Sequence, residues 1–337
     1  MENSTSALNV NSPERKFRAG VEPYRDCEPF DLRIIEVGDG HSLYLEQCGS
    51  PIGAPVLVLH GGPGGGCNSA MRYFFDPAAY RAILFDQRGC GRSRPNASVA
   101  ANTTQHLLGD IEKIRNELGI DRWILFGGSW GASLALLYAQ MHPERVAGMV
   151  LRGVFLMSSS ELCWFYRGGA AKFWPSEWEQ FVEPIPEKER GDLIKAYHRR
   201  LFCGDVIEEI AFAKRWFRWE SALATLDDIG GRDVPSTYAR AFARLECHYF
   251  SNDGFLDYDG QILDGASLLG DIPGVIIQGR YDMICPPAGA FELSRRWRGS
   301  KLKIVPAAGH ALSEKNIQNE LLQVMDEMKN DLQSMGL

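Results

Sequence analysis

Ser129 lies at the centre of the segment Gly127–Gly131 (GGSWG), which matches the pattern Gly-x-Ser-x-Gly. The pattern is short, but the apolar run Trp123–Phe126 precedes it and a helix-like stretch follows it. A strand, a sharp turn and a helix in this order hold a serine hydroxyl exposed on a strained backbone. Glycines two positions to either side leave room for the neighbouring strand and helix. The sequence therefore predicts a nucleophilic serine on a strand-to-helix turn.

A serine hydroxyl needs a general base, and the base needs a carboxylate that orients it. His310 follows the apolar run Leu302–Val305, and Asp282 follows the apolar run Gly274–Gln278. The chain order serine, acid, histidine is typical of hydrolases whose serine lies on such a turn. Because each residue follows a predicted strand, all three belong to one edge of the sheet. We therefore expect Ser129, Asp282 and His310 to form a catalytic triad.

The glycine-rich loop His60–Gly66 (HGGPGGG) follows another apolar run. It lacks the Gly-Lys-Ser/Thr of a Walker loop and the G-x-G-x-x-G spacing of a dinucleotide-binding loop. In a serine hydrolase such a loop offers a backbone N–H to the developing oxyanion, and the residue after the nucleophile offers a second. We assign these donors to Gly62 and Trp130. His60 is expected to brace the loop by hydrogen bonding.

The elements that must position these residues alternate along the chain. Short apolar runs typical of buried strands occur at Pro55–His60, Ala82–Asp86, Trp123–Phe126 and Val146–Leu151. Helical spacing separates them at Thr103–Leu118 and Ala132–His142. This alternation is typical of an α/β fold with a mostly parallel sheet and helices on both faces.

The alternation is interrupted after about residue 155. From there to about residue 269 the chain is aromatic, charged and helix-like, and the strand pattern then returns at Gly274–Gln278 and Leu302–Val305. This predicts an α/β-hydrolase fold with a helical cap over the carboxyl ends of the strands, where open α/β sheets bind ligands. The expected division is core at 1–155, cap at 156–269 and core again at 270–337.

Composition limits the partners and the compartment. The 337 residues carry a formal net charge of −7, which disfavours nucleic acid and anionic membranes as partners. No apolar run approaches the roughly 20 residues that span a bilayer, and the polar N-terminus predicts no signal peptide. The 8 cysteines show no metal-ligand or disulfide spacing, so we expect reduced thiols, a cytoplasmic location, and neither metal nor cofactor.

The motifs described above resemble, taken together, those of the proline iminopeptidases, or prolyl aminopeptidases. The similarity rests on HGGPGGG, on FDQRGCGRSRP at 85–95, on NTT at 102–104 and on GGSWG, and it extends from about Gly38 to the His310 loop. The first and last motifs are common to many hydrolases, whereas DQRGCGRS joined to GGSWG is more specific. The resemblance implies a metal-free serine exopeptidase that releases an N-terminal residue, preferably proline, from a small peptide or aminoacyl amide.

The resemblance also assigns two glutamates of the cap. Members of this family bind the substrate's N-terminal ammonium with one glutamate in a WxxWE-like segment and one in an ARxExHYF-like segment. The matching residues here are Glu220, in Trp216–Glu220, and Glu246, in Ala243–Phe250. An ammonium that leaves water needs charge-assisted hydrogen bonds, and carboxylates beside aromatic walls supply them. An internal peptide has no such charge, so the pair restricts the enzyme to N-terminal residues.

Further residues match family positions around the substrate. Phe155, Phe165 and Phe250 are expected to form an apolar slot for the pyrrolidine ring, and Arg152 matches a position near the site. Two departures from the family pattern leave a second class of enzymes open. Leu156–Ser160 stands in place of a basic pair, and Cys247 stands in place of asparagine. That class comprises amidases, esterases or aminoacyl transferases acting on a small biosynthetic intermediate.

Two other classes are weighed against these enzymes. A non-catalytic ligand-binding protein of this fold is disfavoured, because the residues of the triad and the oxyanion loop are all present. Dehalogenases and epoxide hydrolases are excluded, because an aspartate nucleophile would replace Ser129.

Overall fold

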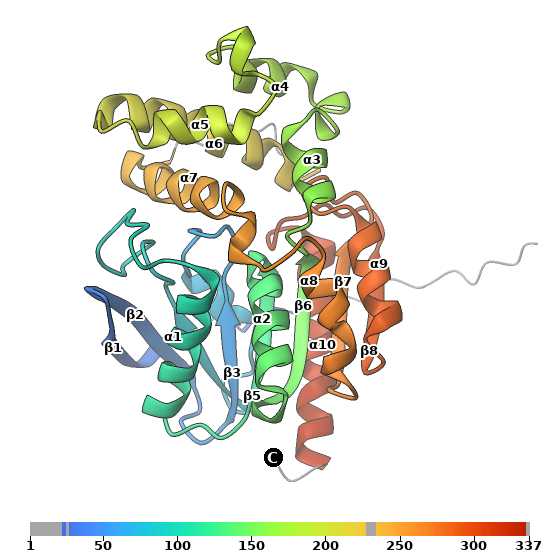
Figure 1. Cartoon of the computed structure of the whole chain (residues 1–337). Helices are drawn as coiled ribbons and strands as arrows, with labels where there is room; N and C mark the ends of the chain where they lie inside the picture. Colours follow the sequence, from blue (N-terminus) through green and yellow to red (C-terminus); the bar gives the residue numbers. More distant parts are fainter. Residues whose placement is uncertain (1–21, 25–26, 227–233, 335–337) are drawn as a thin grey trace, which may run out of the picture.

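A single sheet of 8 strands forms the centre of the molecule in the computed structural model, which describes residues 22–24, 27–226 and 234–334 (Figure 1). The strand order is β1-β2-β4-β3-β5-β6-β7-β8, and all pairs are parallel except β1–β2 and β2–β4. The strands are β1 (Pro29–Gly38), β2 (His41–Gly49), β3 (Ala54–Leu59), β4 (Tyr80–Phe85), β5 (Trp123–Ser129), β6 (Val146–Val154), β7 (Gly274–Gly279) and β8 (Ser300–Val305). This confirms the expected mostly parallel α/β sheet.

Helices cover both faces of the sheet because alternate residues of its inner strands point to opposite sides. Leu57 and Leu59 of β3 pack in the core cluster that includes α1 (Thr104–Glu117), α2 (Trp130–Met141) and α9 (Pro287–Arg296). Val56 and Val58 pack in the other cluster, with α10 (Lys315–Ser334) and the 3-10 helix η1 (Ser69–Phe74).

The cap consists of helices inserted between β6 and β7, and Figure 1 shows them above the sheet. They are α3 (Ser159–Tyr166), η3 (Ala170–Lys172), α4 (Pro175–Val182), η4 (Glu187–Glu189), α5 (Leu193–Leu201), α6 (Val206–Ala224) and α7 (Ser236–Phe250). After them come η5 (Asp253–Phe255), α8 (Gln261–Asp264) and η6 (Gly265–Leu269), and η2 (Pro143–Arg145) precedes β6. Both α8 and η6 contact α2 of the core. No helix within the described ranges is long and apolar enough to cross a membrane.

Asn102, in the NTT segment, joins the cap to the core. Its backbone oxygen accepts a hydrogen bond from His248 Nε2 and its side-chain oxygen accepts one from the Tyr249 hydroxyl, both at 2.9 Å. Its amide donates to the carbonyls of Arg88 and Ser98, each at 3.1 Å. The NTT segment, which the sequence linked only to a family resemblance, thus holds α7 over the carboxyl edge of the sheet.

Candidate active site

Ser129 ends β5 and caps α2, with φ 57° and ψ −125°. This backbone conformation is rare for a residue with a side chain, and it lifts the hydroxyl out of the sheet edge. A Cβ on Gly127 would collide with the carbonyl of Gly131, and a Cβ on Gly131 would collide with the carbonyl of Leu59. The two flanking glycines are therefore required by contacts with the helix and with the neighbouring strand β3.

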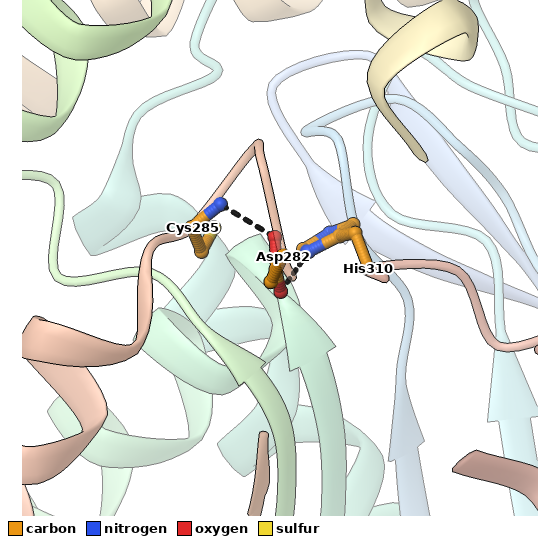
Figure 2. A group of neighbouring side chains, drawn as sticks. All are labelled: Asp282, Cys285 and His310. Carbon is orange, nitrogen blue, oxygen red and sulfur yellow. Dashed lines mark hydrogen bonds and ion pairs between the residues drawn. The ribbon is translucent and has the colours of Figure 1, made fainter. Parts of the chain in front are cut away.

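Asp282 orients His310 through a hydrogen bond, which Figure 2 shows beside the bond from the backbone of Cys285 to the same carboxylate. His310 Nδ1 lies 2.8 Å from Asp282 Oδ2, and both side chains are buried. That oxygen also accepts a bond from Gln278 Nε2 at 2.9 Å, while Oδ1 accepts the N–H groups of Ile284 at 3.1 Å and Cys285 at 2.8 Å. With Nδ1 donating to Asp282, Nε2 of the neutral ring remains an acceptor for a proton.

Asp282, Cys285 and His310 bring three metal-ligand residue types within 4.8 Å of one another (Figure 2). A metal would need the thiolate of Cys285 and a free carboxylate. Burial raises the pKa of the Cys285 thiol well above its ordinary value, and both oxygens of Asp282 already accept N–H groups. This donor set suits an oriented histidine better than a metal ion.

The glycine loop lies directly beside the nucleophile. Gly61 and Gly62 line the same cavity as Ser129, and a Cβ on Gly61 would come within 3.1 Å of Ser129 Cβ. Trp130 is the first residue of α2, so its backbone N–H is one of the unpaired donors at the helix N-terminus. Its side chain is fully buried. The two expected oxyanion donors, the N–H groups of Gly62 and Trp130, thus belong to backbone segments next to Ser129.

A cavity of about 270 Å³ separates the cap from the core. It brings together Ser129, His310 and Gly62 with the six expected substrate-binding residues, Arg152, Phe155, Phe165, Glu220, Glu246 and Phe250. Asp282 and Trp130 do not reach the cavity wall. Sequence reasoning did not anticipate the additional wall residues Phe217, Tyr238, Phe242 and Cys285.

Glu220 on α6 and Glu246 on α7 face one another in this cavity. Both are buried, and neither forms an ion pair with a basic side chain in the part of the chain that the structure describes. The Tyr166 hydroxyl donates to Glu220, and Trp216 Nε1 donates to Glu246 at 2.7 Å. The tryptophan belongs to the WxxWE-like segment, whereas nothing in the sequence pointed to Tyr166.

Burial makes the negative charge of this carboxyl pair costly. Burial raises the pKa of Glu220 to about 6. Burial, together with the charge of Glu220 and a hydrogen bond between the two carboxyls, raises the pKa of Glu246 well above its ordinary value. Two buried carboxylates without a cation repel each other, so the pair is suited to receive a positive charge.

Arg152 lies in the wall of the cavity and also contacts the loop of His310. Its guanidinium is packed over Gly128, and Nη1 donates to the carbonyl of His310 at 2.7 Å. Among the residues that the structure describes, its Nε finds no hydrogen-bond partner. Arg152 lines the cavity, and the hydrogen bond from its Nη1 supports the loop that carries His310.

The aromatic residues surround the carboxyl pair. Phe155 and Phe250 pack edge to face, with ring centroids 5.9 Å apart, and Phe165 also lines the cavity. Phe217 and Phe242 pack in the same manner at 5.4 Å. These rings make most of the wall apolar, which keeps water from screening the charges of the two glutamates.

Comparisons with known proteins agree with this architecture. Residues 54–316 match the family model of the alpha/beta hydrolase fold. A proline iminopeptidase of Xylella fastidiosa is 50% identical over 295 residues, which cover 86% of this chain and 94% of the relative. The proline iminopeptidase of Arabidopsis thaliana is 46% identical and covers 91% of this chain and 82% of its own. That of Neisseria gonorrhoeae is 44% identical, with coverages of 90% and 98%.

Solved structures share the fold at lower identity. An esterase from Rhodococcus superposes with a TM-score of 0.60 at 18% identity, covering 89% of this chain and 99% of its own. A proline iminopeptidase-related protein from Thermus thermophilus gives 0.55 at 24% identity, covering 90% and 96%. Both structures support the fold alone. From the extent of the sequence identity, the chain belongs to the proline iminopeptidase family of α/β hydrolases.

Proposed function

We propose that this enzyme is a serine exopeptidase that releases an N-terminal residue, preferably proline, from small peptides through an acyl-enzyme. The observation that carries the proposal is the buried pair Glu220 and Glu246, which lines the cavity of Ser129 and forms no ion pair with a basic side chain within residues 22–24, 27–226 and 234–334. An N-terminal proline carries a secondary ammonium with two N–H donors, one for each carboxylate. An ammonium held there also replaces the proton that burial of the two carboxyls favours.

The mechanism follows from the arrangement around Ser129. His310 Nε2 takes the proton of the serine hydroxyl as the oxygen attacks the substrate carbonyl, and Asp282 stabilises the imidazolium. The N–H groups of Gly62 and Trp130 stabilise the oxyanion. His310 then protonates the leaving amine, and water attacks the acyl-enzyme by the same route in reverse.

The apolar wall accounts for the preference for proline. Phe155, Phe165 and Phe250 offer flat surfaces to a pyrrolidine ring, which carries no polar group apart from its nitrogen. The ring's nitrogen is then directed to the glutamates. Such a site favours a small apolar N-terminal residue over a charged one.

The setting that we propose is the cytoplasm, with small peptides or aminoacyl amides as partners and neither nucleic acid nor membranes. Two observations support it: the net charge of −7, and the absence of a disulfide among the 8 cysteines, all of which lie in described residues. The proposed chemistry itself requires neither metal nor cofactor.

A panel of chromogenic aminoacyl amides tests the proposal. Hydrolysis is expected to be fastest for the proline amide and to be lost when its amino group is acetylated. If the acetylated amide or a simple ester is the better substrate, the amidase, esterase or aminoacyl-transferase class replaces the peptidase. Transfer of the acyl group to added hydroxylamine, measured beside its release to water, separates acyl transfer from hydrolysis.

A further inference from the structure

His60 is held in one tautomer by its two fixed neighbours. The backbone N–H of Gln87 points to His60 Nε2 at 3.0 Å, and the carbonyl of Gly61 lies 2.9 Å from Nδ1. The first requires an acceptor and the second a donor, so the proton is on Nδ1. The backbone N of Gly66 also lies 3.2 Å from Nδ1. A hydrogen bond from Gly66 would require the proton to be on Nε2, where it would point at the N–H of Gln87. Burial lowers the pKa of His60, so the ring is neutral.

This histidine sets the direction of an oxyanion donor through a shared peptide plane. The carbonyl of Gly61 and the N–H of Gly62 belong to one trans peptide, so they point in opposite directions. His60 Nδ1–H and the N–H of Gly65, the latter at 3.1 Å, both donate to the Gly61 oxygen. Fixing that oxygen fixes the direction of Gly62 N–H.

The side chain of Gln87 joins this loop to the second donor. Its Nε2 donates to the carbonyl of His60 at 2.9 Å, and its Oε1 accepts the indole N–H of Trp130 at 3.2 Å. Gln87 follows β4 and is only 2% exposed. One buried amide therefore bonds both to the residue that orients the Gly62 peptide and to the residue whose backbone N–H is the other donor.

We propose that Gln87 is a positioning residue that sets the spacing of the two oxyanion donors, acting through His60 on Gly62 and through the indole on Trp130. The proposal rests on the serine-hydrolase chemistry of the proposed function. It assigns a role to the glutamine of the DQRG motif, which contacts neither the cavity nor the triad. Because oxyanion donors act on the transition state, its loss lowers kcat and leaves substrate binding unchanged.

The test replaces Gln87 by methionine, which keeps length and volume but removes both side-chain hydrogen bonds. The matched control is Gln47→Met, since Gln47 is a buried glutamine of β2 that bonds to Asp31 and Arg81, outside the site. For a proline anilide, Gln87→Met should lower kcat about ten- to a hundredfold with KM changed less than about threefold. Gln47→Met should leave both constants near those of the wild type.

Two inhibitors give a readout that a general loss of structure would not mimic. A proline boronate forms a tetrahedral adduct on Ser129 that uses the oxyanion donors, whereas prolinol occupies the site without them. Gln87→Met should weaken the boronate by the same factor as kcat and leave prolinol unchanged. Equal weakening of both inhibitors, or none for the boronate, would overturn the proposal.

Trp130→Phe keeps the proposal testable if Gln87→Met does not fold. This variant removes the indole N–H together with part of the buried ring and leaves the backbone donor in place. A fall in kcat with unchanged KM is expected, with weaker binding of the boronate and unchanged binding of prolinol; an unchanged kcat, or equal weakening of both inhibitors, would contradict the proposal.

Hydrolysis of p-nitrophenyl acetate separates this proposal from the proposed function. The ester needs the same oxyanion donors but carries no ammonium, so Gln87→Met should lower its kcat by a similar factor. If the wild type cleaves the ester but not the proline amide, the peptidase function fails and the role of Gln87 is still decided by the ester.

Discussion

The backbone N–H of His310 donates to the carbonyl of Ala224 at 2.9 Å, and the N–H of Ala311 donates to the same oxygen at 2.7 Å. Ala224 is the last residue of α6, and Glu220 lies one turn before it on the same helix. His310 is therefore joined by backbone hydrogen bonds to the helix that carries Glu220, a proposed ammonium ligand. Movement of the cap away from the core would disturb binding and catalysis together.

Replacing Ser129 by alanine should abolish hydrolysis while leaving the fold intact. Loss of a triad nucleophile commonly lowers kcat by about four to six orders of magnitude, because general-base catalysis has nothing left to activate. The steady-state rate with a proline anilide, beside the circular dichroism spectrum, is the measurement. Turnover near that of the wild type in a folded preparation would end the serine-hydrolase interpretation.

Replacing Glu220 or Glu246 by glutamine should affect charged substrates selectively. Each change removes one charge-assisted hydrogen bond to the ammonium, worth roughly 1.5–3 kcal/mol, or about a ten- to a hundredfold fall in kcat/KM. An N-acetylated substrate or a simple ester should be cleaved at nearly the unchanged rate. Equal losses on both kinds of substrate would mean that the glutamates only support the cap.

The affinity for a free amino group should fall in acid. Burial raises the pKa of Glu220 to about 6, and the pKa of Glu246 is higher than its ordinary value. As the pH drops below about 6, the pair binds protons in competition with the substrate ammonium, so KM should rise. A plot of kcat/KM against pH for the proline amide should fall more steeply there than the plot for a neutral ester. Parallel profiles would contradict this competition.

The same carboxyls should make stability depend on pH. A carboxyl whose pKa is higher in the folded than in the unfolded chain stabilises the fold below its unfolded pKa, and this contribution is lost as the pH rises through the folded pKa. For Glu220 this stabilisation is lost as the pH rises from the ordinary pKa of 4.5 to beyond the folded pKa of about 6. Glu220→Gln removes the ionisation, so its Tm relative to the wild type should increase between about pH 5 and about pH 8. A difference that shrinks over this range would contradict the buried pair.

A bulky thiol reagent should inhibit through Cys285. Its thiol lines the cavity beside His310, whereas the exposed Cys163 and Cys203 lie outside the cavity. Burial raises the pKa of Cys285, so modification should be slow at neutral pH and faster in base. Cys285→Ser should abolish inhibition by a methanethiosulfonate, and Cys163→Ser should not. Undiminished inhibition of Cys285→Ser would place the sensitive thiol elsewhere.

Several features of this protein are determined by the sequence alone because they depend on local backbone geometry. The serine turn needs glycine at 127 and 131 to avoid two carbonyls, and this need is visible as a spacing. The order of Ser129, Asp282 and His310, each after a strand, follows from the parallel sheet. Strand β1 was not predicted, although its apolar residues Phe30, Leu32 and Ile34 alternate as in a strand; they lie on an exposed face.

Other features are decided only when distant segments pack. Glu220 and Glu246 lie on different helices, and the folded cap alone gives them a common cavity, the hydroxyl of Tyr166 and raised pKa values. Arg152 packs its guanidinium over Gly128, its partner in the β5–β6 pair, and donates to the carbonyl of His310, which follows β8. Such contacts depend on side chains from elements far apart in the chain, and no local pattern of residue types encodes which of them will meet.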